Sequence, residues 1–140
     1  MHYLDTSILV AALTHEIRTA DIQRWLAAQT PEELTISEWV VVEFSGALSL
    51  KLRNGQLEAA QRVAALAMFT RLIEDSLTVL PVSSLDFRTA ARFADQHVTG
   101  LHSGDALHLG IVSHRGAHLI TLDQVMAAAA TTLGLSAELL

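Results

Sequence analysis

The segment His2-Tyr3-Leu4-Asp5-Thr6-Ser7-Ile8-Leu9-Val10 decides the fold, because it places one carboxylate between two apolar runs. Residues 2–4 predict a short buried strand, and residues 6–14 predict a helix. Asp5 is therefore expected at the carboxyl end of the strand. An unpaired buried charge costs several kcal/mol or shifts its pKa until it is neutral, so this carboxylate needs a partner.

Three further acids stand next to apolar runs in the same way: Glu43, Asp105 and Asp123. Glu43 has the least room for water, because Val42 precedes it and Phe44 follows it. The chain has no obvious basic partner for each acid. Because clusters of oxygen ligands suit a hard divalent cation, we predict a Mg²⁺ or Mn²⁺ site. Its expected ligands are Asp5, Glu43, Asp105 and Asp123.

Short apolar runs alternate with longer amphipathic ones, which is typical of an α/β fold. The expected strands are residues 2–4, 34–36, 77–82 and 117–121. The expected helices are residues 6–14, 18–29, 38–53, 56–75, 84–97, 103–115 and 123–134. Serines should cap three of these helices at their amino ends, at position 37, at 83 or 84, and at 103. Gly116 should close the sixth.

This arrangement sends the acids to one edge of the sheet. In open parallel sheets, ligand sites form beyond the carboxyl ends of the strands. Asp5 and Asp123 follow the first and last expected strands, and Asp105 lies in the first turn of a helix. Glu43 lies in the second turn of the helix after the second strand and can lean over the same edge.

Each acid also has a simpler explanation. Asp5 and Asp123 precede helices and could be their N-caps. Asp105 could favour its helix through the dipole alone. The pair Asp105 and His108 could instead belong to a transition-metal site, but the other six histidines show no ligand spacing. We therefore favour the carboxylate site.

Composition limits the class of protein. The chain has 140 residues, 51% of them hydrophobic, with a mean hydropathy of +0.36, and we expect a single domain, residues 1–140. It has no cysteine, which excludes disulfides and thiolate metal sites. No apolar run approaches the roughly 20 residues that span a bilayer, and the amino terminus lacks a basic region. We expect a cytoplasmic protein with no membrane partner.

Charge alone argues against a nucleic-acid partner, because the formal net charge is −6. Without the four candidate ligands, however, eleven acids remain against nine bases, and bound divalent ions would bring the site close to neutral. A nucleic-acid substrate must therefore be inferred from the site. There is no glycine-rich phosphate loop, so the sequence does not support nucleotide binding of that kind.

Four segments in order resemble the motifs of the PIN domain, and specifically of VapC-type toxins from bacterial toxin–antitoxin pairs. They are Tyr3-Leu4-Asp5-Thr6-Ser7, Glu43 within its helix, the run from Leu101 to Leu109, and Leu119-Ile120-Thr121-Leu122-Asp123. Their order and spacing match across nearly the whole chain. His102 stands where many relatives carry an arginine.

The resemblance implies a three-layer fold with a small, mostly parallel sheet flanked by helices. It implies a Mg²⁺- or Mn²⁺-dependent endoribonuclease whose metal ligands and catalytic residues are Asp5, Glu43, Asp105 and Asp123. Ser7 and Thr121 would support them. It also implies an RNA substrate, a cognate antitoxin protein and a homodimer.

The sequence leaves two alternative functions open. The first is a phosphohydrolase of the haloacid dehalogenase type with Asp5 as nucleophile, although Ser7 occupies the position where that family carries a second aspartate. The second is a PIN-like binding module without catalytic activity.

Overall fold

The computed structural model describes all residues from 1 to 140 and contains one parallel sheet with the strand order β3-β2-β1-β4-β5. The strands are β1 (His2–Leu4), β2 (Leu34–Ser37), β3 (Thr78–Leu80), β4 (His118–Thr121) and β5 (Ala137–Leu139). Tyr3 pairs with Thr35 of β2 on one side and with Leu119 of β4 on the other. The amino-terminal strand is therefore the centre of the sheet.

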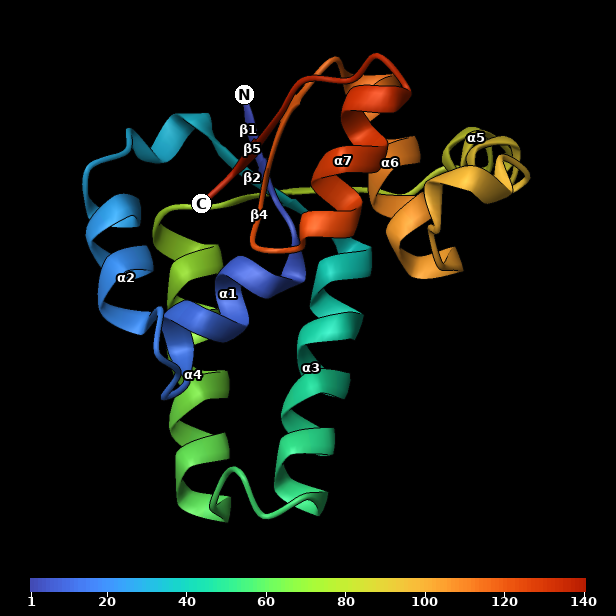
Figure 1. Ribbon diagram of the computed structural model, residues 1–140. Helices are drawn as coiled ribbons and strands as arrows, with labels where there is room; N and C mark the ends of the chain where they lie inside the picture. Colours follow the sequence, from blue (N-terminus) through green and yellow to red (C-terminus); the bar gives the residue numbers. More distant parts are fainter.

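Helices flank this sheet, as the α/β fold class predicted (Figure 1). They are α1 (Thr6–Leu13), α2 (Thr19–Ala27), α3 (Glu38–Arg53), α4 (Ala59–Asp75), α5 (Ser84–Ala94), α6 (Ser103–Arg115) and α7 (Gln124–Thr132). Short 3₁₀ turns lie at Pro31–Glu33 and His97–Thr99. Figure 1 shows α3 and α4 as a long helical hairpin that extends away from the sheet. No helix has both the length and the apolar character that crossing a membrane requires.

One cluster of 29 buried apolar residues forms the core. Tyr3 and Leu4 of β1 are fully buried within it, as a central strand requires. The rings of Phe44 and Phe69 lie 4.3 Å apart, centroid to centroid, and join α3 to α4. Aromatic pairs of this kind add about 0.5–1.5 kcal/mol beyond the burial of their area.

The four expected strands are confirmed, but several boundaries were wrong. β3 begins at Thr78 rather than at residue 77, and its pairing ends at Leu80, as Pro81 within the expected strand indicates, because proline has no N–H to continue it. α4 begins at Ala59 rather than at residue 56, because Glu58 and Gln61 form a capping box at the start of the helix. α5 ends at Ala94, well before residue 97.

The cap of α6 also corrects the sequence analysis. The N-cap is His102 and not Ser103, because the Asp105 side chain accepts a hydrogen bond from the His102 N–H. β5 was not predicted at all. It is a short, half-exposed edge strand without an apolar run, so its pairing with β4 leaves little trace in the local sequence.

A buried carboxylate joins α5 to α6. Asp86 is fully buried, and its Oδ2 accepts hydrogen bonds from Ser83 N (2.7 Å) and Ser83 Oγ (2.9 Å). Its Oδ1 lies 2.8 Å from His114 Nδ1 of α6. Burial by itself would raise the pKa of Asp86, but the hydrogen bonds from Ser83 and His114 outweigh it and lower that pKa.

This lowered pKa predicts how stability depends on pH. The folded-state pKa of Asp86 lies below the ordinary value of 3.8, so its stabilising contribution is complete above that value and is lost as pH falls through the folded-state pKa. We expect the free energy of unfolding, measured by urea titration, to fall more steeply between about pH 4 and pH 2 in the wild type than in Asp86→Asn. Equal slopes would show that the Asp86 carboxylate does not stabilise the fold.

Candidate active site

Asp5 lies at the carboxyl end of β1 and is 2% exposed. Ser7 Oγ donates to its Oδ1 at 2.5 Å, and Thr121 Oγ1 donates to its Oδ2 at 2.7 Å. The Ile8 N–H also reaches Oδ1, at 3.4 Å, so Asp5 is the N-cap of α1 as well. Burial raises the pKa of Asp5, although the positive charge of His108 and these hydrogen bonds lower it in part. The carboxylate is therefore well oriented but poorly solvated.

Ser7 and Thr121 connect Asp5 to the segment that follows β4. Leu4 pairs with Ile120, which places the ends of β1 and β4 next to each other. Ser7 Oγ accepts from the Leu122 N–H at 3.0 Å, and Thr121 Oγ1 accepts from the Asp123 N–H at 2.9 Å. Each hydroxyl thus links the Asp5 carboxylate to a backbone N–H of the segment that contains Asp123.

Asp105 and Asp123 approach the same edge from two helices. Asp123 caps α7 by accepting from the Met126 N–H at 2.9 Å. Asp105 lies in the first turn of α6, and its side chain is 24% exposed. Burial raises the pKa of Asp105, and the negative charge of Asp123 raises it further, against the opposing hydrogen bond from His102. The two carboxylates therefore lie within electrostatic reach of each other.

Glu43 projects from α3 into a separate network. Its Oε1 accepts from Thr6 Oγ1 at 2.7 Å and lies 2.5 Å from His108 Nε2. Burial would raise the pKa of Glu43, but the hydrogen bond and charge of His108, together with the Thr6 bond, lower it. Gly104 of α6 is close by, since a Cβ there would lie 3.3 Å from Glu43 Oε2.

The partner of Glu43 is a residue that the sequence analysis did not assign. His108 is 2% exposed, and its Nδ1 lies 2.8 Å from Tyr3 Oη, which in turn lies 2.7 Å from Ser37 Oγ. Burial raises the pKa of Tyr3 far above its usual range, so the phenol keeps its proton. The three-residue spacing between Asp105 and His108 suggested that the two could form a transition-metal site. In the structure, His108 bonds to Glu43.

The exposed His102 has a different environment. Its side chain is 96% exposed, and its Nδ1 lies 3.9 Å from Asp105 Oδ2. It therefore stands at the rim of the site, where a contact with solvent or substrate costs little.

The four acids fit a hard divalent cation by their chemistry. All are carboxylates, and burial raises the pKa values of Asp5 and Asp105, so a cation bound beside them would stabilise their ionised forms. In the arrangement of side chains seen here, no three histidine or acidic groups converge closely enough to hold an ion by themselves. Mg²⁺ keeps several waters and is bound by one or two carboxylates in many enzymes, so such a closed cage is not required.

Comparison with known proteins identifies the family. Residues 2–131 match the model of the PIN domain, and the chain belongs to this family. No curated protein matches the sequence.

Solved structures share the fold over nearly the whole chain. One is VapC20 from Mycobacterium tuberculosis, a sarcin-ricin loop cleaving toxin, with 20% identity, coverage of 92% of this chain and 95% of that chain, and a TM-score of 0.71. PAE2754 from Pyrobaculum aerophilum has 25% identity, coverage of 97% and 82%, and a TM-score of 0.69. VapBC2 from Rickettsia felis, bound to a DNA fragment from their promoter, has 18% identity, coverage of 99% and 98%, and a TM-score of 0.66.

Proposed function

We propose that this PIN domain is a metal-dependent endoribonuclease and the toxin of a type II toxin–antitoxin pair. One observation carries the proposal. The buried Asp5 carboxylate lies at the carboxyl edge of the parallel sheet, with its pKa raised, beside the end of β4, which Asp123 follows two residues later. The similarity of the fold to VapC20, a sarcin-ricin loop cleaving toxin, supports RNA as the substrate.

The chemistry follows from the positions of the acids. A bound Mg²⁺ or Mn²⁺ would lower the pKa of a water molecule and neutralise charge on the phosphoryl oxygens. Asp5 is the central ligand of this proposal, with Asp105 and Asp123 on the adjoining helices. Ser7 and Thr121 hold the two Asp5 oxygens in a fixed orientation. Because water attacks instead of the 2′-hydroxyl, the products should carry 5′-phosphate and 3′-hydroxyl ends.

Glu43 has a different environment, and we propose a second role for it beside that of ligand. Thr6 and His108 hold its Oε1, which leaves Oε2 on the side of Gly104 and the amino end of α6. Its lowered pKa keeps it ionised at neutral pH. It can therefore orient a water molecule at the edge where Asp105 lies.

The haloacid dehalogenase alternative has no support in the geometry. Ser7 stands where that family carries its second aspartate, and its hydroxyl donates a hydrogen bond to Asp5 Oδ1, so the pair of aspartates is absent.

We propose the same partners that the resemblance implies. The fold is shared with VapBC2, which is bound to a DNA fragment from their promoter, and this supports a cognate antitoxin. Exposed apolar side chains on α3 and α4 are available for an antitoxin or for a second copy of the chain: Val42, Leu50, Val63 and Met68.

Addition and removal of metal test the function. Purified protein incubated with total RNA should produce new 5′-phosphate ends in the presence of Mn²⁺, and none when EDTA is in excess. The products can be followed by gel electrophoresis and by ligation that requires a 5′-phosphate. Cleavage that is unaffected by EDTA would contradict the metal mechanism, and a lack of cleavage of any RNA would favour the non-catalytic binding module.

A further inference from the structure

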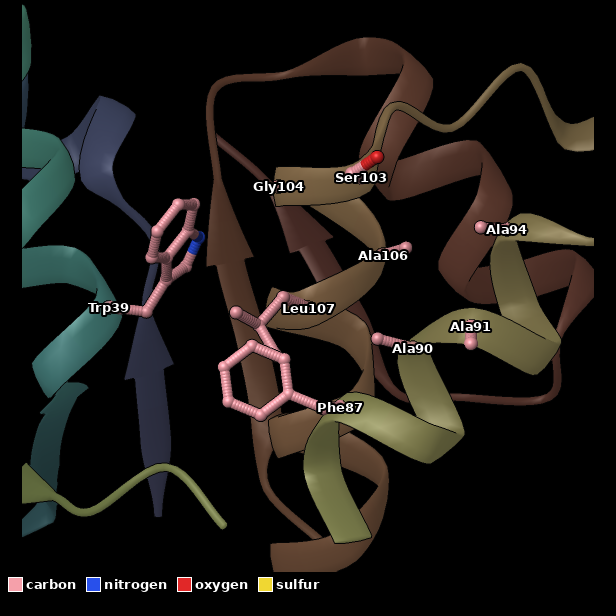
Figure 2. Close-up of a pocket in the computed structure, with 9 residues that line it drawn as sticks. All are labelled: Trp39, Phe87, Ala90, Ala91, Ala94, Ser103, Gly104, Ala106 and Leu107. Carbon is pink, nitrogen blue, oxygen red and sulfur yellow. The ribbon is translucent and has the colours of Figure 1, made fainter. Parts of the chain in front are cut away.

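A cavity of about 330 Å³ opens between α3, α5 and α6 (Figure 2). Two aromatic rings, Trp39 and Phe87, border it on one side. Small residues of α5 and α6, among them Ala90 and Ala106, line the opposite wall. Because these alanines project little, the space between the rings and the helices suits a flat ligand.

The lining carries no charged side chain. One of its aromatic rings is exposed, and the other has an indole N–H without an acceptor. Seven of the nine lining residues are hydrophobic, and Ser103 offers the only side-chain hydroxyl. Phe87 is 57% exposed, although it is a large aromatic residue. Trp39 Nε1 is buried and has no hydrogen-bond acceptor. An indole N–H that is buried usually finds an acceptor, so this donor is unsatisfied in the free protein.

The cavity and the candidate active site share a wall. Trp39 lies one helical turn before Glu43 on α3, so the two side chains emerge from the same face. A Cβ at Gly104 would lie 3.4 Å from Trp39 Cζ2 and 3.3 Å from Glu43 Oε2. Figure 2 shows the indole nitrogen on the edge of the ring that faces α6. A molecule in the cavity would therefore lie next to Glu43.

We propose that this cavity binds a nucleobase next to the phosphate that is cleaved. The inference rests on the proposed ribonuclease function and adds a specificity site to it. A base is flat and uncharged and stacks on aromatic rings, whereas a phosphate would find no cation in this lining. The wall that the cavity shares with Glu43 favours a base over the side chain of a partner protein, because an RNA whose phosphate lies at the carboxylates would bring a neighbouring base to this position.

The first test is the sequence preference of cleavage. A random-sequence pool of single-stranded RNA is cut with Mn²⁺, and both ends of the products are sequenced. Wild-type protein should prefer one base, or one class of base, at a position flanking the cut. Phe87→Ala should reduce that preference by roughly tenfold or more, since stacking on one aromatic ring contributes that much to binding of a base. Ile17→Ala, which removes a fully exposed apolar side chain from the segment between α1 and α2, should leave the preference unchanged.

The second test does not depend on cleavage. The chain has two tryptophans, so Trp25→Phe leaves Trp39 as the only indole. In the Asp5→Asn background and without metal, the same RNA pool should quench the fluorescence of Trp39, and inorganic polyphosphate, which has no bases, should not. Adding Phe87→Ala should weaken this quenching by roughly tenfold.

The outcomes separate the two proposals. Quenching that depends on Phe87, without cleavage of any RNA, supports the base site and refutes the ribonuclease. If Phe87→Ala cleaves RNA with the wild-type base preference, and if RNA quenches its Trp39 fluorescence as strongly as without the substitution, the ribonuclease is supported and the base site is overturned. The cavity would then be left to a partner protein. Equal quenching by polyphosphate also overturns it, because charge alone would then explain the signal.

Discussion

Asp5→Asn is expected to lower metal-dependent RNA cleavage by roughly a hundredfold or more, the usual cost of removing a group that stabilises charge in the transition state. The substitution keeps the shape of the side chain but removes the negative charge from the end of β1. Ser7 and Thr121 both donate to this carboxylate, so no other group can take over its place in the network. Rates on a fluorescently labelled RNA, with saturating Mn²⁺, measure the effect.

The fold should survive this change, which makes the loss of activity interpretable. Burial raises the pKa of Asp5, so the ionised form is held there at a cost that the neutral asparagine avoids. We expect a melting temperature equal to that of the wild type or slightly above it. Asp75→Asn at the exposed end of α4 is the matched control and should retain full activity. Equal cleavage by Asp5→Asn and wild type would remove Asp5 from the mechanism.

Gly110→Ala should destabilise the fold by about 1–3 kcal/mol, the cost of forcing an extra carbon into a tight packing contact. Gly110 faces α5 from the middle of α6. A Cβ there would lie 2.6 Å from the Asp86 carbonyl oxygen and 3.1 Å from Ala90 N. Both are backbone atoms, which cannot rotate away as a side chain would. The clash therefore exceeds the gain of about 1 kcal/mol that alanine has over glycine inside a helix.

The opposite result is expected at Gly46 in α3. A Cβ at this position meets nothing within 4 Å. Gly46→Ala should therefore stabilise the protein by roughly 0.5–1 kcal/mol through helix propensity alone. Urea denaturation of both variants measures the difference. Stabilisation by both substitutions would mean that α5 can move away from α6 without cost.

The two largest effects concern different parts of the molecule. Asp5 lies at the sheet edge where we propose that RNA is cleaved. Gly110 lies in the contact between α6 and α5, and α5 carries Phe87. Gly110→Ala should consequently also disturb the cavity that α5 and α6 enclose. Asp5→Asn should leave the cavity intact.

The site was partly predictable from sequence because a charge among apolar residues is a local signal. Asp5, Asp105 and Asp123 stood out for this reason, and the structure shows that the cap explanation also holds for Asp5 and Asp123. Their roles as metal ligands stay a prediction. The need of Glu43 for a partner was visible in the sequence, but the identity of that partner was not, since His108 lies 65 residues further along the chain.

The sequence by itself determined the α/β class, the order of the elements and the four main strands, because alternation, helical periodicity and capping residues act over a few neighbouring positions. Only the tertiary structure decided the pairing of β5 with β4, the contacts of His108 with Glu43 and Tyr3, and the approach of α5 to Gly110. It also decided that Trp39 and Phe87 border one cavity. These features depend on side chains that are distant in the chain and meet only when the sheet and its helices pack, which no local pattern encodes.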